Sequence, residues 1–250
     1  MGDSPVNYER TGAAALVTID RPQRRNAVDA ETAALLREYL ERFEQDDAAR
    51  VLVLTGTGGA FCAGADLKAM DLDIDHPSGP MGFTRVTPSK PTIAAIGGWC
   101  LAGGMEIAMW CDLRIVTEDS TFGLFERRWG VPLIDGGTQR LPLIVGMGRA
   151  LELTLTGRPV DAHEALRIGL ANEVVPSGKH VERALELAER LAAFPQETML
   201  ADRRAMLEGA RMPWTEALEY EYQQGRAVME VAARGASRFA GGEGRHGTGV

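Results

Sequence analysis

The sequence predicts an α/β protein, with a mostly parallel β-sheet in its first half and a helical region after about residue 137. Short runs of β-branched and aliphatic residues alternate with amphipathic segments, which is typical of strand–helix–strand units with a well-covered sheet. The composition fits this class, because 45% of the 250 residues are hydrophobic and 25% are charged. Such a chain can bury a large core in a soluble domain.

The first predicted unit joins strands at 13–19 and 51–54 through a helix over 29–46. Asp29 can cap the start of this helix with its carboxylate. The apolar positions of the helix recur every three or four residues, at Leu36, Leu40 and Phe43. These side chains therefore define one buried face, and the charged residues define the opposite one.

The second predicted unit contains the most apolar stretch of the chain, residues 93–111. We predict strands at 92–96 and 113–117 on either side of a helix over 103–110. The apolar stretch is long enough to span a bilayer, but its two Gly-Gly pairs and the central Glu106 argue against a membrane segment. We therefore expect no interaction with a membrane.

The second half of the chain is predicted to be helical. Helices are expected over 137–145, 147–155, 161–168, 181–193, 196–210 and 214–233, with a short strand at 173–175. The final residues, GGEGRHGTGV, are expected to be disordered because they are rich in glycine and lack apolar side chains that could dock.

The charge and the cysteines narrow the functional classes. The net charge of −8 disfavours general binding to nucleic acids, whose phosphates would be repelled. Cys62, Cys100 and Cys111 form no CxxC pair, which favours reduced thiols in a cytoplasmic protein. The four histidines give no metal-ligand pair at helical spacing, so no metal site is expected. No GxSxG, HExxH or P-loop motif is present.

Two glycine-rich junctions each follow a predicted strand. They are GGAFCAGADLKAM over 58–70 and GGWCLAGGMEIAM over 97–109, and each is predicted to run from a strand through a turn into a helix. A helix start presents free N–H groups, so the two junctions could each aim one N–H at a single oxygen and form an oxyanion hole. The alternative is that the glycines only permit turns and close packing.

Two glutamates lie in apolar surroundings. Glu106 is flanked by Met105 and Ile107, and Glu126 follows Leu124 and Phe125. An unpaired buried carboxylate is unfavourable, so each residue needs either a partner or a function. Paired carboxylates with raised pKa values suit general acid–base catalysis. The alternative partners are arginines, namely Arg114, Arg127 and Arg128.

Four segments in a fixed order resemble the crotonase (enoyl-CoA hydratase/isomerase) family. The segments are AFCAGADLKAM, KPTIAAIGGWCLAGGMEIAMWCDLRI, TFGLFERRWGVPLIDGGTQRLP and TGRPVDAHEALRIGLANEVVP. The resemblance covers about residues 15–176 and implies a core of repeated ββα turns with a helical C-terminal region used for trimerisation. It divides the chain into a core over 1–190 that holds an acyl-CoA site and an oligomerisation region over 191–250. Homotrimers or dimers of trimers are therefore expected.

The resemblance also implies the roles of individual residues. The thioester oxygen of an acyl-CoA would be held by the backbone N–H groups of Ala65 and Gly103. The segment RPQRRNAV resembles the family's CoA-contacting segment. The residues expected to contact CoA are Arg24, Arg25, Ala27, Ala63, Asp66, Leu67, Lys68 and Gly104. No metal or redox cofactor is implied, because CoA is part of the substrate.

Hydratases of this family keep one glutamate in the GGxE helix and a second after an FG pair, which correspond to Glu106 and Glu126. The resemblance therefore implies addition of water to a trans-2-enoyl-CoA, with Glu106 taking the proton of water and Glu126 supplying one to the α-carbon. The reversed assignment remains open. The alternatives are an enoyl-CoA isomerase, which can work with one carboxylate, and a non-catalytic acyl-CoA-binding protein. An RNA-binding homologue is disfavoured by the acidic charge.

The sequence departs from the family pattern at two places. Phe125 stands where a proline usually precedes the second glutamate, and Leu133 and Ile134 replace the Pro-Gly of a PGxGG turn. We expect Ile134 to narrow the acyl pocket. Asp135 is either a third acid in the pocket or, as we expect, the cap of the helix that starts near Gly136.

Overall fold

The computed structural model describes residues 4–243, and its first half is built around a large β-sheet. Within these residues the large sheet consists of β1 (Val6–Thr11), β2 (Ala14–Ile19), β3 (Val51–Gly56), β5 (Thr92–Ile96), β7 (Leu113–Thr117) and β10 (Glu173–Val175), in that order. β1 and β2 form an antiparallel hairpin, and every later neighbour pairs in parallel. The predicted α/β class with a mostly parallel sheet is therefore confirmed.

A second, smaller sheet goes beyond the sequence prediction. Its strands are β4 (Ala60–Cys62), β6 (Trp99–Leu101), β8 (Thr121–Gly123) and β9 (Val160–Asp161), in that order. β4, β6 and β8 each follow a strand of the large sheet after a short connection, so the chain repeats a pair of strands followed by a turn or a helix. This repeat is the ββα spiral that the resemblance implies.

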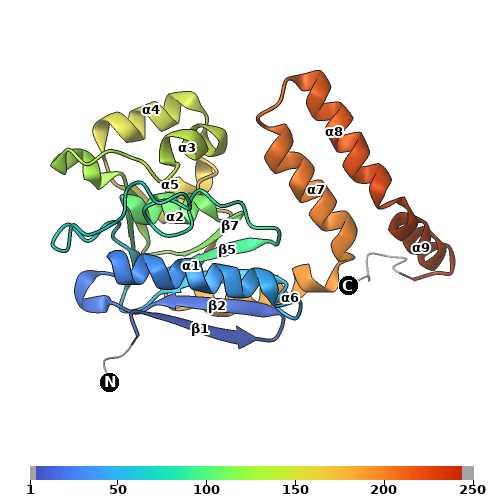
Figure 1. Cartoon of the computed structure of the whole chain (residues 1–250), viewed down its shortest axis with the longest axis horizontal. Coiled ribbons are helices and arrows are strands. Elements are labelled where there is room, and N and C mark those ends of the chain that lie inside the picture. The colour runs from blue at the N-terminus through green and yellow to red at the C-terminus, as the bar shows by residue number, and fades with distance from the viewer. Residues whose placement is uncertain (1–3, 244–250) are drawn as a thin grey trace. The chain divides into compact units, whose positions relative to one another are not determined.

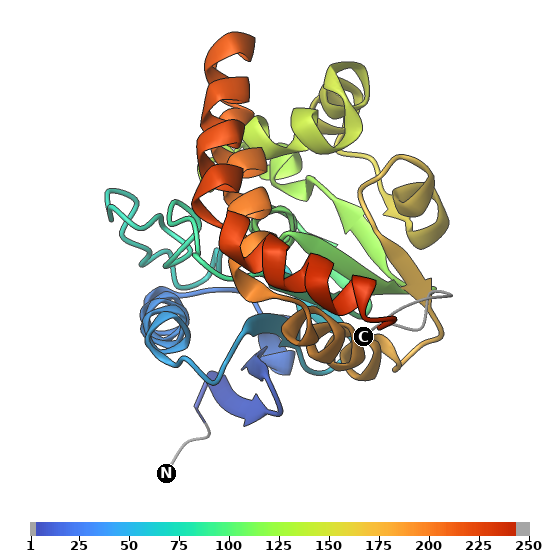
Figure 2. The ribbon, with the colours of Figure 1, turned by 90° about the vertical axis from the view of Figure 1, so that its right-hand side faces the viewer.

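Helix α1 (Ala30–Gln45) packs beside β1 and β2, as Figures 1 and 2 show from two sides. Asp29 caps it by accepting a hydrogen bond from the Thr32 N–H at 3.0 Å. Its buried side chains include Leu36, Leu40 and Phe43. The predicted cap and the predicted apolar face are therefore both confirmed.

The remaining helical segments of the core mostly agree with the prediction. They are the 3-10 helices η1 (Pro22–Arg24) and η2 (Phe125–Trp129), and the α-helices α2 (Gly103–Trp110), α3 (Gly137–Val145), α4 (Met147–Thr156), α5 (Ala162–Arg167) and α6 (His180–Ala193). The helix predicted within 58–70 is wrong. The chain there makes one turn, in which Asp66 O accepts from Ala69 and Met70, and the positive φ of 49° at Met70 ends it.

The chain divides into two compact units, with the boundary after Ala188. The second unit contains α7 (Gln196–Gly209), α8 (Trp214–Ala227) and α9 (Met229–Ala240), and α7 and α8 run side by side (Figures 1 and 2). The single helix predicted over 214–233 is wrong, because Val228, with φ −113° and ψ 14°, separates α8 from α9. Most of the tail that we expect to be disordered, residues 244–250, lies outside the described residues.

No helix within residues 4–243 combines the length and the apolar character that crossing a bilayer requires.

Candidate active site

The two glycine-rich junctions meet in the folded chain. α2 begins at Gly103, and the backbone of Gly64 and Ala65 lies against that first turn. A Cβ built on Gly64 would lie 2.8 Å from the Gly103 nitrogen, and one built on Gly103 would lie 3.7 Å from the Ala65 nitrogen. Among residues 4–243, neither the Ala65 nor the Gly103 N–H donates a hydrogen bond. Both N–H groups are therefore available to an acceptor from outside the described residues, and they lie on adjoining backbone segments, which is compatible with an oxyanion hole.

Close backbone packing explains why this junction needs glycine. A Cβ on Gly104 would overlap the carbonyl oxygen of Cys62, so β4 can pack directly on α2 only because Gly104 has no side chain. Ala102, just before α2, adopts a positive φ of 51°, a strained value for a residue with a side chain. Its N–H donates to Gly123 O at 2.8 Å, which fixes the start of α2 on β8. Backbone strain of this kind is typical of functional sites.

Glu106 lies one turn into α2 and is only 3% exposed. Its Oε1 accepts hydrogen bonds from the N–H groups of Asp135 at 3.0 Å and Gly137 at 2.8 Å. A Cβ on Gly137 would lie 2.9 Å from the same oxygen, so a side chain there would displace the Glu106 carboxylate. Burial, together with the nearby charges of Asp135 and Glu126, raises the pKa of Glu106 to about 7.

Glu126 lies in η2, is 5% exposed, and has two buried carboxylate oxygens. Neither oxygen has a hydrogen-bond partner among the described residues. Burial raises the pKa of Glu126, which therefore favours its protonated form. A buried carboxyl group without a partner is unfavourable for folding, so Glu126 is a candidate functional residue.

The alternative explanation, that the two glutamates form salt bridges with arginines, does not hold among the described residues, although the charge of Arg127 offsets part of the effect of burial on the pKa of Glu126. Within residues 4–243, neither Glu106 nor Glu126 takes part in a salt bridge. Arg114 instead donates to the carbonyl oxygens of Leu170 and Cys111. The guanidinium of Arg128 lies 3.8 Å above the ring of Phe125.

Asp135 does not cap α3, so that prediction is wrong. The cap residue of α3 is Gly136, and no side chain accepts a hydrogen bond there. The Asp135 carboxylate turns away from the helix, because it accepts hydrogen bonds from the Met81 N–H at 3.1 Å and from the Thr84 hydroxyl. Sequence reasoning missed Met81 and Thr84 because they lie in the loop over 71–90, whose run of aspartates is typical of a solvated, flexible loop.

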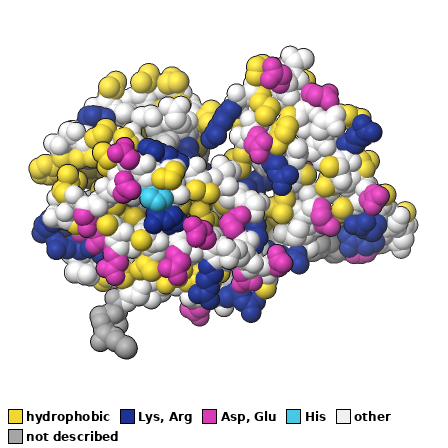
Figure 3. Space-filling model, viewed as in Figure 1, with side chains coloured by type: hydrophobic (Ala, Val, Ile, Leu, Met, Phe, Trp, Pro, Cys, Tyr) yellow, Lys and Arg dark blue, Asp and Glu magenta, His cyan; other side chains and the backbone are white. Residues whose placement is uncertain are grey.

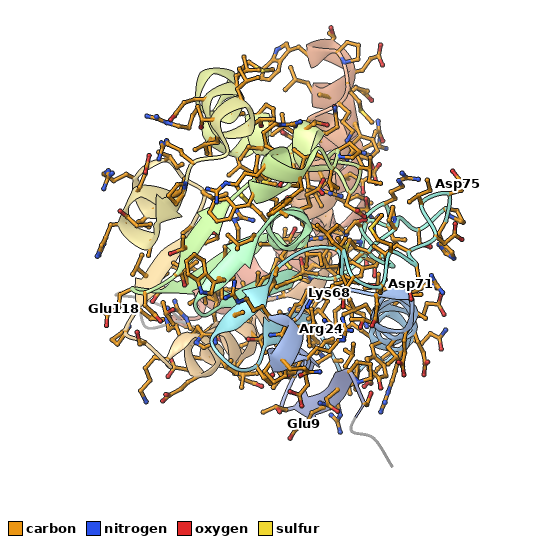
Figure 4. The ribbon with its side chains drawn as sticks, turned by 90° about the vertical axis from the view of Figure 1, so that its left-hand side faces the viewer. Glu9, Arg24, Lys68, Asp71, Asp75 and Glu118 are labelled. Atoms are coloured by element: carbon orange, nitrogen blue, oxygen red, sulfur yellow. The ribbon has the colours of Figure 1, made fainter. Side chains whose placement is uncertain are left out.

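The two segments expected to contact CoA lie side by side. Ala63 donates to Arg25 O at 3.0 Å, and Val28 and Ala65 form a parallel bridge. Figure 4 shows the side chains of Arg24 and Lys68 on one face of this unit. Of the expected contact residues, Arg24, Arg25, Leu67 and Lys68 are exposed, Ala63 is partly buried, and Ala27, Asp66 and Gly104 are buried.

Arg21 is a residue of this region that the sequence did not single out. Its guanidinium donates to Asp66 at 3.1 Å and to Ala27 O, and it also pairs with Asp29. Burial alone would raise the pKa of Asp66, but hydrogen bonds from the Lys68 N–H and from Arg21 hold it below its ordinary value. Arg21 thereby holds together the segments around Asp66 and Ala27, and the cations left facing solvent are Arg24, Arg25 and Lys68. The signal was available, since Arg21 begins the segment RPQRRNAV.

Comparison with known proteins finds relatives of this chain in both sequence and structure. The sequence profile of the Enoyl-CoA hydratase/isomerase family matches residues 9–243. A probable enoyl-CoA hydratase from Rhizobium meliloti is 38% identical over 219 residues, which are 85% of each chain. A short-chain-enoyl-CoA hydratase from Clostridium acetobutylicum is 37% identical over 86% of each chain. The crystal structure of an enoyl-CoA hydratase from Mycobacterium tuberculosis superposes with a TM-score of 0.90, at 34% identity, over 95% of this chain and 96% of that one.

Proposed function

Because the chain belongs to the enoyl-CoA hydratase/isomerase family, we propose that it is a hydro-lyase that adds water reversibly across the double bond of a trans-2-enoyl-CoA. The single observation that carries this proposal is the pair of buried carboxyl groups, Glu106 and Glu126, in the unit that also brings together the N–H groups of Ala65 and Gly103. Two carboxyl groups suit the addition of water, which needs one proton removed and another delivered.

The backbone amides of Ala65 and Gly103 would bind the thioester carbonyl oxygen. When water attacks the β-carbon, negative charge develops on this oxygen, and two fixed N–H groups stabilise it. Each well-placed donor contributes about 3 kcal/mol to such a transition state. The Gly103 amide lies at the positive end of α2, so the helix dipole acts in the same direction.

The two carboxyl environments favour different protonation states. Glu106 accepts two backbone hydrogen bonds, which favour its ionised form. We therefore assign it the role of general base, which takes a proton from the attacking water. Glu126 has no hydrogen-bond partner among the described residues, which favours its protonated form. We therefore assign it the role of general acid, which delivers a proton to the α-carbon. The hydroxyl group from water reaches the β-carbon and the proton from Glu126 reaches the α-carbon from the same face of the double bond, so the addition is syn.

The phosphates of CoA would lie near Arg24, Arg25 and Lys68, the cations exposed beside the site. Their position reconciles the net charge of −8 with a polyanionic substrate, because local cations attract phosphates even when the whole chain is acidic. No step of the proposed reaction needs a metal or a redox cofactor.

We also propose that the chain forms homotrimers or dimers of trimers in the cytoplasm. Neither α8 nor α9 buries a side chain within its own unit, which leaves apolar residues such as Trp214, Leu218 and Phe239 exposed. Figure 3 also shows hydrophobic side chains gathered over α4, where Met147, Leu151 and Leu155 are exposed. Sedimentation equilibrium tests the proposal, because a mass near 27.0 kDa would refute self-association.

The function is tested with trans-2-enoyl-CoAs of short, medium and long acyl chain. Hydration removes the absorbance of the conjugated thioester, and Glu106→Gln and Glu126→Gln should each slow it by about 100-fold or more. Glu118→Gln is the matched control, since Glu118 is exposed and lies apart from Arg24 and Lys68 in Figure 4. The proposal fails if no enoyl-CoA reacts or if both variants keep the wild-type rate. A chain that moves the double bond of a 3-enoyl-CoA without adding water is an isomerase instead.

A further inference from the structure

Residues 79–84 are the part of the loop over 71–90 that is packed into the core, although the sequence predicts a solvated surface there. Met81, Phe83 and Thr84 are all buried, and Thr84 is only 1% exposed. The terminal methyl of Met81 occupies the space where a Cβ on Gly103 would point. Met81 therefore covers one side of the residue whose N–H is proposed to hold the thioester oxygen.

Asp135 anchors this segment through its side chain. Its carboxylate, on a residue that is 2% exposed, accepts the Met81 N–H at 3.1 Å and the Thr84 hydroxyl. Arg140 reinforces the connection, because it donates to Asp135 O at 2.8 Å and to Thr84 O at 2.6 Å. Two hydrogen bonds to the Asp135 carboxylate thus tie the loop to the turn before α3, and a third, from Arg140, ties it to α3 itself.

The backbone of the same residue holds the proposed general base. The Asp135 N–H donates to Glu106 Oε1 at 3.0 Å, and no other residue in the described part of the chain contacts both Glu106 and Met81 through hydrogen bonds. One residue therefore connects the reacting carboxylate with the segment that covers Gly103. This connection is additional to α2 itself, which carries both Gly103 and Glu106.

Charge provides a second link between Asp135 and Glu106. The charged groups that face Glu106 are Asp135 from the turn before α3 and Glu126 from η2, and the guanidinium of Arg140 lies beyond them at the Asp135 carbonyl. The negative charge of Asp135 disfavours ionisation of Glu106 and so adds to the effect of burial on its pKa. A base with a higher pKa accepts a proton more readily, provided that it is still ionised at the working pH.

We propose that Asp135 is a positioning residue of the hydration: its N–H orients Glu106, while its carboxylate holds Met81 and Thr84 against the oxyanion hole. The inference rests on the proposed function, and it assigns a role to Asp135, which follows the two residues, Leu133 and Ile134, that depart from the family's turn. Asp135 does not touch the substrate, but it fixes the distance between the group that removes a proton and the group that stabilises the oxygen. A misplacement of about 1 Å between such groups can lower the rate about 100-fold.

Two substitutions at this position separate geometry from charge. Asp135→Ala removes the acceptor of both loop hydrogen bonds, whereas Asp135→Asn keeps an acceptor oxygen and removes the charge. We expect kcat to fall about 10- to 100-fold in Asp135→Ala. In Asp135→Asn we expect kcat to stay much closer to the wild-type value, so that most of the loss seen in Asp135→Ala is avoided. In Asp135→Asn the acidic limb of the kcat profile should move to lower pH, because Glu106 loses a neighbouring negative charge.

Asp112→Ala is the matched control. Asp112 makes the same kind of contact elsewhere, since its carboxylate accepts the N–H of Thr92 at 2.8 Å and the hydroxyl of Thr92 at 3.2 Å. Its loss should lower stability but leave the acidic limb in place. Thr84→Val covers the case in which Asp135→Ala does not fold, because it removes one donor to Asp135 and changes the volume little. We expect Thr84→Val to reduce kcat about threefold, by a smaller misplacement of the same segment.

Amide hydrogen exchange gives a readout that does not depend on activity. In Asp135→Ala the amides of 79–84 and of the first turn of α2 should exchange faster together, and Asp112→Ala should leave both slow. The inference is overturned if folded Asp135→Ala keeps the wild-type kcat, if Asp135→Asn recovers none of the loss, or if the exchange of the two segments does not change. If the wild-type chain hydrates no enoyl-CoA while the two segments still loosen together, the proposed function fails and the coupling through Asp135 stands.

Discussion

Replacing Glu106 by glutamine should stabilise the folded chain at alkaline pH and remove most of its activity. The wild-type carboxyl group has a pKa of about 7 instead of the ordinary 4.5, because of its burial and the nearby charges of Asp135 and Glu126. A glutamine can still accept the N–H groups of Asp135 and Gly137 through its amide oxygen, but it never becomes charged. The substitution therefore removes the unfavourable ionisation and keeps the local structure.

The size of the effect follows from the two pKa values. Between pH 4.5 and about 7 the folded chain binds more protons at this site than the unfolded chain does, so stability falls as the pH rises through this window. The loss levels off at about 3 kcal/mol above pH 7. The variant lacks this loss but buries an amide group, so we expect it to be about 1–3 kcal/mol more stable than the wild type at pH 8.5. The difference should shrink toward zero as the pH falls to 4.5.

Urea unfolding at equal protein concentrations over this pH range measures the effect, and the difference between variant and wild type cancels the other titrating groups. Glu118→Gln, at an exposed position, should show no pH-dependent difference. In the same samples, kcat for the enoyl-CoA should fall about 100-fold or more in Glu106→Gln. A stability difference that stays constant from pH 4.5 to 8.5 would refute the argument that Glu106 ionises in a buried site.

The fold and the site give three further predictions. Asp29→Ala removes the cap on the Thr32 N–H and also the ion pair with Arg21, so it should lower stability by about 1 kcal/mol or more, or Tm by at least about 2–4 °C. Calorimetry measures this loss, and initial rates check that kcat is unchanged. Gly104→Ala places a methyl group on the Cys62 carbonyl, so it should lower the free energy of unfolding by about 2 kcal/mol or more and also lower kcat. A variant with the stability and kcat of the wild type would contradict the packing argument. The double variant Arg24→Ala, Lys68→Ala should raise KM about tenfold and make KM less sensitive to salt, with kcat nearly unchanged. A lowered kcat at constant KM would contradict the proposal that these cations bind the phosphates of CoA.

The large sheet and α1 could be predicted because their signals are long and regular. Leu36, Leu40 and Phe43 repeat at helical spacing, and β3 and β5 are continuous apolar runs. The smaller sheet could not, because β4, β6 and β8 have three residues each and stand next to glycines. A run of that length shows no period, and its pairing depends on segments far away in the sequence.

In the candidate site, too, the features that depend on neighbouring residues could be predicted from the sequence, and those that depend on distant residues could not. Glu106 and Glu126 stand out in the sequence because a charged residue among apolar ones is a local contrast. The link through Asp135 is not visible, because Met81 and Thr84 lie more than 50 residues earlier, and a carboxylate before a helix is most often a cap. The separation of α8 from α9 at Val228 also lacks a signal, since neither Gly nor Pro stands there.

The sequence GGMEIA at the start of α2 combines a packing requirement with a chemical one. Gly103 is small because Gly64 and the methyl of Met81 approach it, and Gly104 is small because the Cys62 carbonyl lies against it. These contacts press the helix start onto β4, and within residues 4–243 the Gly103 N–H, at the positive end of the helix dipole, donates to no acceptor. Glu106 follows three residues later, so a rise of about 4.5 Å along the helix separates the backbone of the proposed oxyanion donor from that of the proposed base. Substitutions at either glycine should therefore change stability and kcat together, whereas substitutions at Glu106 should change them in opposite directions at alkaline pH.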